Sequence, residues 1–440
     1  MGYRLRTIYF LTPLFVLLFI PTLLSAYESD LAESARSLIQ PPSLKASSWL
    51  LMDSRTGTII ASEKKDKRIE PASLSKLMTA YVVFQEIQRG IVRLDEEVTV
   101  SEKAWKTMGS RMFIEPGDRV RVEDLLLGLI VQSGNDAAVA LAEHVAGSEA
   151  GFADLMNQAA VQMGLKNTHF VNSTGLPHPD HFSTAYDISE ITRTIIRQQP
   201  EHYGFYAISE FTWNGITQKN RNPLLARDDT VDGVKTGHTK SAGYCLVGSA
   251  ERNNMRLIAS VMGASSERSR ANSVYSLLKY GFAAYEFHHL YGNQAAILQA
   301  DIFKSKVESI PVGISQGIDL LLPKGSGASL QAKVQLSEPL VAPLEIGQEV
   351  GTLTILLKNA VLVTRQLIAL GPAPAASAPG HTACRHWSGR RSSRFRGREA
   401  NRAARPDARS GTDAARGGPG PSTLNASATA HRHRSHAPDV

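Results

Sequence analysis

The spacing of apolar residues predicts a series of helices in the first two thirds of the chain. From residue 74 to residue 82, apolar side chains recur with a helical period, which predicts a helix from Pro71 to about Arg89. Pro71 suits the first helical position, because its missing N–H is not needed there. Further helical periods cover residues 122–147, 152–165, 187–199 and 271–287.

Alternating apolar and polar residues predict strands on both sides of these helices. Residues 47–71 read as two strands around an Arg-Thr-Gly turn, and strands return at 207–215, 233–250 and 254–264. The last two strands are joined by a short polar connection of the hairpin type. Strands at both ends with helices between them predict one α/β (α+β) domain, in which helices flank an antiparallel sheet.

The pattern changes after about residue 290. From there to residue 368 the chain shows short alternating runs separated by Pro and Gly, which predicts a separate small all-β domain. The predicted organisation is a signal peptide at 1–26, the α/β domain at 27–287, the all-β domain at 288–370 and a disordered Arg-rich tail at 371–440.

The N-terminal residues predict export. Two arginines precede an apolar run from Ile8 to Leu24, and small residues follow where a signal peptidase would cut. Two prolines interrupt the run, and its length is near the short limit for a membrane span. A cleaved signal with a mature chain from about Tyr27 is the favoured interpretation, and an uncleaved anchor is the alternative.

The charge of the protein is concentrated in the tail. The chain of 440 residues has a net charge of +7, but residues 371–440 contain 12 arginines, no lysine and four acidic residues. The first 370 residues therefore carry −1, and we expect no nucleic-acid partner for the folded part. Arginine without lysine suggests GC-rich DNA translated out of frame, with an RNA-binding tail as the alternative.

The two cysteines do not predict a disulfide. Export normally favours disulfides, yet only Cys245, in an alternating apolar run, and Cys384, in the tail, are present. We expect Cys245 to be a small buried apolar side chain and Cys384 to be a stray thiol.

Three short motifs suggest nucleophilic chemistry. The first is Ser73-x-x-Lys76, whose two side chains lie on one face of the predicted helix, one turn apart. The second is Ser133-Gly-Asn135, and the third is Lys235-Thr-Gly237. Each motif alone is weak, because a serine at a helix start is commonly only a cap. The ordered trio, separated by about 60 and 100 residues, is a strong signal.

With these motifs in this order, the chain resembles the penicillin-recognising serine acyl transferases, specifically the low-molecular-mass penicillin-binding proteins that act as D-alanyl-D-alanine carboxypeptidases. The segments around the motifs, at 167–187, 211–225, 231–250 and 256–264, are also similar to that family. The likeness covers about residues 40–368. It implies a penicillin-binding/β-lactamase-like domain and an exported, periplasmic hydrolase. It also implies no cofactor, a peptidoglycan pentapeptide as substrate and β-lactams as covalent inhibitors.

The residues themselves suggest how the chemistry would run. Ser73 is a poor nucleophile until a base removes its proton, and Lys76 can do so only if its pKa falls from about 10.4 toward 7. Burial and a nearby like charge both act in that direction, and Lys235 is the expected neighbour. Ser133 could deliver a proton to the leaving amine, and Asn135 could hold the substrate carbonyl or the lysine.

The third motif predicts the substrate-binding strand. Gly237 would let an extended peptide lie against this strand and add to the sheet edge. The resemblance implies that the backbone N–H groups of Ser73 and His238 form the oxyanion hole.

The terminal carboxylate of the substrate needs cationic and hydroxyl partners. The resemblance implies that Lys235, Thr236 and Thr239 face this carboxylate. It also implies that Arg270 binds it, with Arg268 as a rival assignment.

Particular residues bear on other possible functions. His178, Asp180 and His181 are clustered, but a solvated loop is favoured over a zinc site, and no metal is expected. A class A β-lactamase needs a glutamate that activates water, and the chain has none between Glu149 and Glu190. A D,D-transpeptidase and a non-catalytic cell-wall-binding scaffold remain alternatives.

The tail leaves membrane attachment open. The family usually ends in an amphipathic helix that lies on the membrane surface. The sequence after Leu370 has no apolar stripe of that kind, so an anchor is not evident.

Overall fold

A computed structural model of the protein describes residues 40–376. The predicted signal peptide at 1–26, Cys384 and most of the predicted tail lie outside the described residues. Between residues 40 and 376, no helix is both long and apolar enough to cross a membrane.

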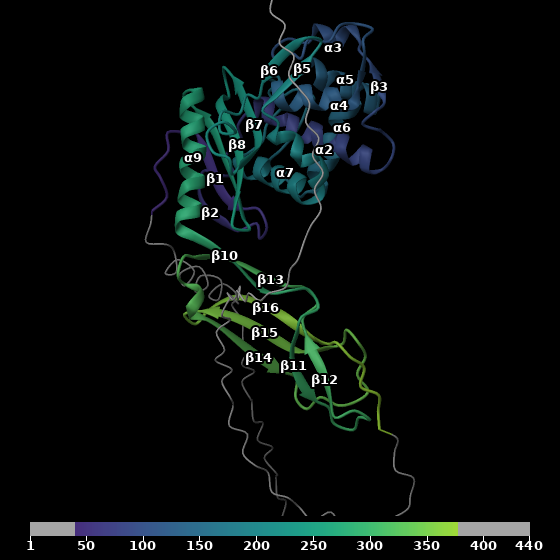
Figure 1. Cartoon of the computed structure of the whole chain (residues 1–440), viewed down its shortest axis with the longest axis vertical. Coiled ribbons are helices and arrows are strands. Elements are labelled where there is room, and N and C mark those ends of the chain that lie inside the picture. The colour runs from purple at the N-terminus through teal and green to yellow at the C-terminus, as the bar shows by residue number, and fades with distance from the viewer. Residues whose placement is uncertain (1–39, 377–440) are drawn as a thin grey trace, which may run out of the picture. The chain divides into compact units, whose positions relative to one another are not determined.

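The centre of the first domain is a five-stranded sheet with the order β2-β1-β9-β8-β7 (Figure 1). Its strands are β1 (Ser48–Asp53), β2 (Ile59–Glu63), β7 (Val231–Thr239), β8 (Gly243–Arg252) and β9 (Met255–Ala264). All neighbouring pairs are antiparallel, as predicted. Asn253 and Asn254 close the β8–β9 hairpin with φ values of 49° and 62°, which suit a tight hairpin turn.

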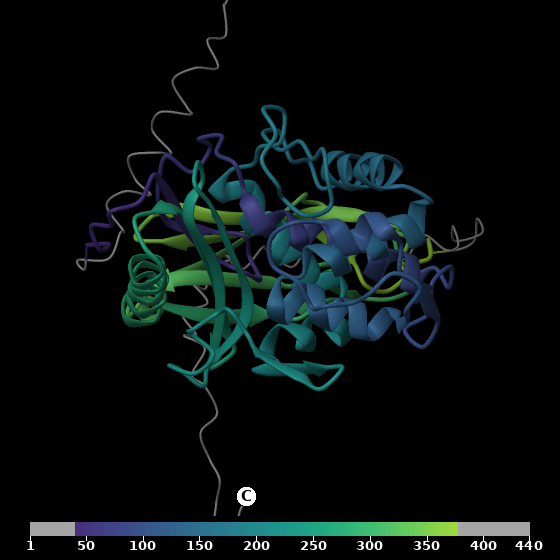
Figure 2. The same ribbon diagram turned by 90° about the horizontal axis from the view of Figure 1, so that it is seen from above.

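Both faces of this sheet are buried. All six residues of β1 are buried, with Leu50 and Met52 in one core cluster and Trp49 and Leu51 in the other. Figures 1 and 2 show α9 on one side of the sheet and the remaining large helices on the other. These helices are α2 (Lys76–Gln88), α5 (Asn135–Ala146), α6 (Glu149–Gln162), α7 (Ala185–Gln198) and α9 (Glu267–Ala284).

Two predicted helices differ from the structure at the motifs. The helix expected from Pro71 begins as the 3₁₀ helix η1 (Ala72–Ser75) and continues as α2. The helix expected over 122–147 is broken into α4 (Val122–Leu127), the π-helix η2 (Gly128–Gln132) and α5. The break lies at Ser133, within the five polar or glycine residues 132–136 that interrupt the apolar series, and the predicted helix runs across this interruption.

The single strand expected at 233–250 is two antiparallel strands, β7 and β8, because the chain turns back at residues 240–242. The remaining predicted elements hold with shifted ends. The strand expected at 207–215 is one arm of a hairpin, and the helix expected at 271–287 starts at Glu267 and ends at Ala284. The short elements are β3 (Glu97–Thr99), α3 (Glu102–Lys106), β4 (Arg119–Arg121), α8 (Pro200–Tyr203), η3 (Gly204–Ala207), β5 (Glu210–Trp213) and β6 (Ile216–Lys219).

The all-β part has its own sheet and core. Five antiparallel strands follow the order β11-β12-β16-β15-β14, and β10 pairs with β13. Val312, Leu353 and Leu367 are fully buried at its centre. The elements are β10 (Tyr285–Tyr291), β11 (Ala296–Asp301), β12 (Ser309–Gly313), β13 (Ile318–Pro323), η4 (Gly327–Ser329), β14 (Leu330–Leu336), β15 (Glu349–Leu357) and β16 (Ala360–Ala369). The predicted fold class, an α+β domain followed by a small all-β domain, is confirmed.

Cys245 is a buried free thiol in β8, as expected. Burial raises its pKa to about 11, so the thiol stays protonated at neutral pH.

Candidate active site

The first motif is held where η1 passes into α2. The side chain of Lys76 is buried, and its Nζ lies 3.1 Å from Ser73 Oγ. The spacing of three residues therefore brings the amine within hydrogen-bonding distance of the hydroxyl, as the sequence predicts.

The other partners of Lys76 set the direction of its lone pair. Nζ donates to Asn135 Oδ1 at 2.6 Å and to the carbonyl oxygen of Thr174 at 2.7 Å. The amide of Asn135 is oriented in turn, because its Nδ2 donates to the carbonyl oxygen of Met108 at 2.5 Å. A neutral amine has two N–H donors and one lone pair. Because both donors are used on pure acceptors, the lone pair is left for the hydroxyl of Ser73.

The environment lowers the pKa of Lys76 to about 7. Burial is the largest cause and the positive charge of Arg221 is the next, while the carboxylates of Asp136 and Glu149 oppose them. Burial, followed by the charge of Lys76, also lowers the pKa of Lys235 well below its usual value. The like charge that lowers the pKa of Lys76 is therefore Arg221 and not Lys235, the neighbour expected from the sequence; the effect between the two lysines is that of Lys76 on Lys235.

Ser133 presents an unbonded hydroxyl to the site. Its backbone lies in the left-handed region with φ of 65°, directly before α5 begins. Ser133 Oγ is buried and has no hydrogen-bond partner within the described residues. This free hydroxyl is available to a substrate group or a water molecule.

The third motif lies on β7, at the edge of the central sheet. Lys235 is buried, and its Nζ donates to the carbonyl oxygen of Thr236 at 3.2 Å. Gly237 has a packing role besides the one expected from the sequence. A Cβ atom there would lie 3.0 Å from Pro71 O and 3.3 Å from Leu74 Cγ, so glycine lets β7 approach η1.

A cleft of about 350 Å³ opens beside these motifs. Its lining includes Ser73, Ser133, Arg221, Thr236, His238 and Arg270. The residues from all three motifs therefore converge on one cleft. Its cations and hydroxyls suit an anionic group.

The arginines and His238 occupy distinct positions in the cleft. Arg270 is buried and donates to the carbonyl oxygen of Gly237 at 3.0 Å. Arg268, the rival assignment, is exposed and is not part of the cleft lining. The ring of His238 stacks on Tyr244, with ring centroids 4.1 Å apart.

Thr239 is placed differently from the other predicted residues. Its hydroxyl lies 3.4 Å from Glu70 Oε2 and accepts a hydrogen bond from the backbone N–H of Ala242. It is not part of the cleft lining. The structure therefore places Thr239 at the β7–β8 turn.

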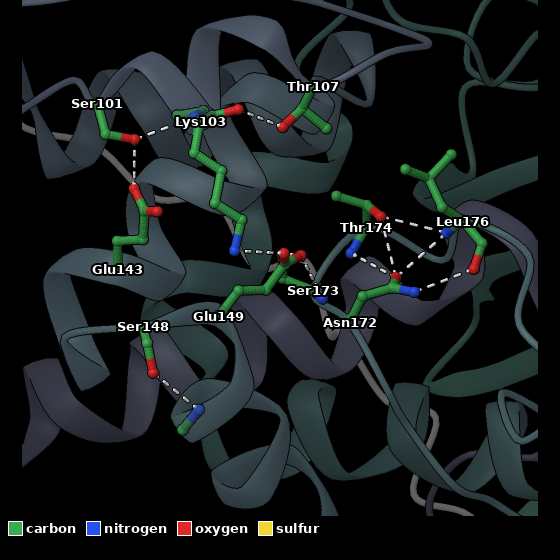
Figure 3. A network of polar contacts seen from close by, with 12 residues as sticks. Ser101, Lys103, Thr107, Glu143, Ser148, Glu149, Asn172, Ser173, Thr174 and Leu176 are labelled. Atoms are coloured by element: carbon green, nitrogen blue, oxygen red, sulfur yellow. Dashed lines mark hydrogen bonds and ion pairs between the residues drawn. The ribbon is translucent and has the colours of Figure 1, made fainter.

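A short segment within 167–187, to which the sequence analysis assigned no role in the site, supports Lys76. Residues 172–176, here called the Thr174 loop, carry the carbonyl that accepts from the lysine. Asn172 Oδ1 accepts from the backbone N–H groups of Thr174 and Leu176 (Figure 3). It also accepts from the backbone N–H of Gly175 at 2.7 Å. Glu149 accepts from both the N–H and the hydroxyl of Ser173. These contacts fix the loop, and hence the acceptor for Lys76.

The clustered histidines differ in burial and in their hydrogen-bond partners. His181 is buried, and its Nε2 lies 2.8 Å from Ser75 Oγ, whereas His178 and Asp180 are exposed and pair loosely at 3.8 Å. Within residues 40–376, no group of three His, Cys, Asp or Glu side chains is arranged to hold a metal ion.

Comparisons with known proteins agree with this arrangement. Residues 35–266 match the family described as D-alanyl-D-alanine carboxypeptidase, and residues 285–372 match the C-terminal domain of penicillin-binding protein 5. The chain is 40% identical over 364 residues to D-alanyl-D-alanine carboxypeptidase DacC of Escherichia coli (strain K12), covering 81% of this chain and 89% of that protein.

Solved structures show the same relationship. Penicillin-binding protein 5 from Haemophilus influenzae matches with a TM-score of 0.72 and 38% identity, covering 76% of this chain and 99% of that one. The Streptomyces K15 DD-transpeptidase matches with a TM-score of 0.53 and 30% identity, covering 56% of this chain and all of that one. The chain therefore belongs to the D-alanyl-D-alanine carboxypeptidase family.

Proposed function

We propose that this enzyme, a serine-type D-Ala-D-Ala carboxypeptidase, uses Ser73 as its nucleophile and neutral Lys76 as its base. The observation that carries this proposal is the set of three partners of Lys76 Nζ, which uses both N–H groups and leaves the lone pair for Ser73. Ser73 Oγ attacks the carbonyl carbon of the penultimate D-alanine while its proton passes to Lys76.

The negative oxygen formed in this step needs donors. We assign them to the backbone N–H groups of Ser73 and His238, because both residues line the cleft. When the tetrahedral intermediate collapses, the D-alanine amine leaves with a proton delivered through Ser133. Water then hydrolyses the ester on Ser73 and completes the reaction.

The cations of the cleft suit the terminal carboxylate of a peptidoglycan pentapeptide. Arg221 lines the cleft and is exposed, so it is available to a carboxylate together with Lys235 and Thr236. Arg270 donates a hydrogen bond to Gly237 O. We therefore infer that it also holds β7, the strand that the peptide would join. Thr239 faces the turn and contributes less than the sequence suggests.

Two alternatives within the same superfamily follow from the fate of the acyl-enzyme. A β-lactamase would need a carboxylate beside the ester, but Glu149 points to Ser173 and Lys103 and does not line the cleft. Glu267 does line it, but pairs with Arg270 at 3.5 Å and is largely exposed. A transpeptidase would pass the acyl group to an amine, and this remains a side activity to test.

The setting of the enzyme is also part of the proposal. We infer export to the periplasm through the signal peptide at 1–26. We further infer a catalytic domain at 27–287, an all-β spacer or docking domain at 288–370 and a tail at 371–440. We also propose that the enzyme can contact the outer face of the cytoplasmic membrane.

The test of this function is the intact mass of the mature protein after incubation with benzylpenicillin. We expect one penicilloyl adduct on the wild type and none on Ser73→Ala. Because Glu267, a carboxylate that lines the cleft, is paired with Arg270, we expect slow deacylation and a persistent adduct. Failure of the folded wild type to form an adduct would favour the non-catalytic scaffold, and rapid drug turnover without an adduct would favour a β-lactamase.

The charge of Glu149 gives a smaller, pH-dependent prediction. Its carboxylate raises the pKa of Lys76, so Glu149→Gln should lower that pKa. The amide oxygen can still accept from Ser173. Only the neutral amine is a base, so the rise of the acylation rate with pH should move to lower pH. The maximal rate should stay within about twofold of the wild type.

The matched control for this variant is Glu143→Gln on the adjacent helix α5, shown in the same view (Figure 3). Glu143 accepts from Ser101 and does not contribute to the pKa shift of Lys76. Both variants would be followed by the rate of penicilloyl formation across the pH range. An equal midpoint in Glu149→Gln and Glu143→Gln would contradict the electrostatic role of Glu149.

A further inference from the structure

A continuous hydrogen-bonded chain leads to the peptide bond that precedes Ser73. The backbone N–H of Val171 donates to His181 Nδ1 at 3.3 Å. His181 Nε2 lies 2.8 Å from Ser75 Oγ, and Ser75 Oγ donates to the carbonyl oxygen of Ala72 at 2.9 Å. Ser75 and His181 are both buried, so water does not compete for these bonds.

The direction of this chain follows from its first bond. A backbone N–H can only donate, so Nδ1 of His181 must accept and carries no proton. In a neutral imidazole the proton then lies on Nε2, which donates to Ser75 Oγ. The hydroxyl proton of Ser75 is free for Ala72 O, so all three bonds point toward that carbonyl. Burial is the largest cause that lowers the pKa of His181, to about 4, so the ring is neutral at neutral pH.

The carbonyl of Ala72 belongs to the same peptide unit as the N–H of Ser73. A hydrogen bond accepted by the oxygen of an amide polarises the amide, and chains of such bonds strengthen one another. The N–H on the other side of the unit thereby becomes a better donor. In the proposed reaction, this N–H is one of the two groups that stabilise the oxyanion.

The same peptide needs to be held in place. Ala72 has φ of 51°, in the left-handed region that is unfavourable for a residue with a side chain. Contacts must therefore over-determine its conformation. Besides Ser75, the backbone N–H of Leu74 donates to Pro71 O at 3.1 Å and closes the turn around Ala72.

We propose that His181, acting through Ser75, is a positioning residue for the oxyanion hole, which holds and polarises the Ala72–Ser73 peptide. This inference rests on the proposed role of Ser73. His181 lies behind η1 and does not line the cleft, so it acts without touching the substrate. Ser75, the third residue of the Ser-x-x-Lys motif, would then have a function beyond packing.

Two substitutions of similar polarity separate this role from simple packing. The amide of His181→Gln can reach the position of Nε2 and donate to Ser75. The shorter amide of His181→Asn lies near the position of Nδ1 and leaves Ser75 without its donor. We expect the acylation rate constant with benzylpenicillin to fall about tenfold in His181→Asn and to stay within about threefold of the wild type in His181→Gln.

Ser75→Ala breaks the chain at its other end and tests it without altering the histidine. We expect about the same tenfold loss as in His181→Asn. The double variant should lose little more than either single one, because each change removes the same chain. If His181→Asn does not fold, Ser75→Ala carries the test alone.

A spectroscopic signal reports the oxyanion hole directly. The carbonyl of the penicilloyl ester on Ser73 can be followed by isotope-edited infrared difference spectra. A weaker N–H donor should shift this band to higher wavenumber in His181→Asn and Ser75→Ala, but not in His181→Gln. If His181→Asn and Ser75→Ala both show the acylation rate and the band position of the wild type, the inference is overturned. So would a rate loss in His181→Asn and His181→Gln alike with an unchanged band. Absence of any adduct on the wild type would overturn the proposed function as well.

Discussion

Lys76→Arg is expected to lower the rate of penicilloyl formation by about a thousandfold, although it keeps N–H donors at this position. Arginine stays protonated at any accessible pH and has no lone pair to accept the proton of Ser73. The donors to Asn135 and Thr174 can be retained, so the loss would come from the base and not from the hydrogen bonds.

The pH dependence should separate the base from a purely structural lysine. The pKa of Lys76 is lowered to about 7, so the neutral fraction rises as the pH passes through that value. The wild-type acylation rate should rise with it and level off above, whereas Lys76→Arg should lack this rise. Lys106→Arg, on the exposed side of α3, is the control and should behave as the wild type. A wild-type rate that is flat between about pH 6 and pH 8 would point to another base.

The parts of the site that follow from local spacing could be predicted from the sequence. Ser73 and Lys76 are three residues apart at the start of a helix, so their proximity is a property of the helix itself. The positions of Ser133 and Lys235 are different, because α5 and β7 are brought to the same cleft only by tertiary packing. No period in the sequence encodes that convergence. The ordered motifs indicated it only through resemblance to a family.

The parts that were missed share a physical reason. The second acceptor for Lys76 is the backbone carbonyl of Thr174, and every residue has such a carbonyl, so no residue type marks it. Asn172 acts only through the shape of the loop, and Arg221 reaches the cleft from an irregular segment. Reasoning from residue identity finds side chains with distinctive chemistry. It does not find backbone groups, or the residues that hold those groups in place.

Gly237 has a second role that the sequence does not indicate. The sequence suggests a bare strand along which a peptide could lie, and Gly237 does line the cleft. An added side chain would also meet Pro71 and Leu74, so the glycine allows β7 to pack against η1. The strand is still at the sheet edge, so a peptide can join it. The absence of a side chain at Gly237 therefore permits a short distance between β7 and η1, the helix that carries Ser73.

Gly175 makes the same kind of close approach from the other side of η1. Its φ is 82°, and a Cβ atom there would lie 1.8 Å from Ala72 O and 2.9 Å from Ser75 Oγ. The first contact is with backbone, which cannot turn aside as a flexible side chain can. In Gly175→Ala, either the Thr174 loop or the Ala72–Ser73 peptide must move. One change removes the acceptor of Lys76, and the other displaces the N–H of Ser73.

We therefore expect Gly175→Ala to lower the acylation rate at least about a hundredfold and the free energy of unfolding by about 3 kcal/mol. Gly164→Ala is the matched control, because its φ is 73° but nothing lies within 4 Å of the added methyl. It should cost about 1 kcal/mol of stability from the backbone alone and leave acylation unchanged. Denaturant unfolding and penicilloyl formation would be measured on both variants. Equal acylation rates in the two would mean that the contact between the Thr174 loop and η1 does not control the nucleophile, whereas a loss confined to Gly175→Ala would assign that control to the contact with Ala72.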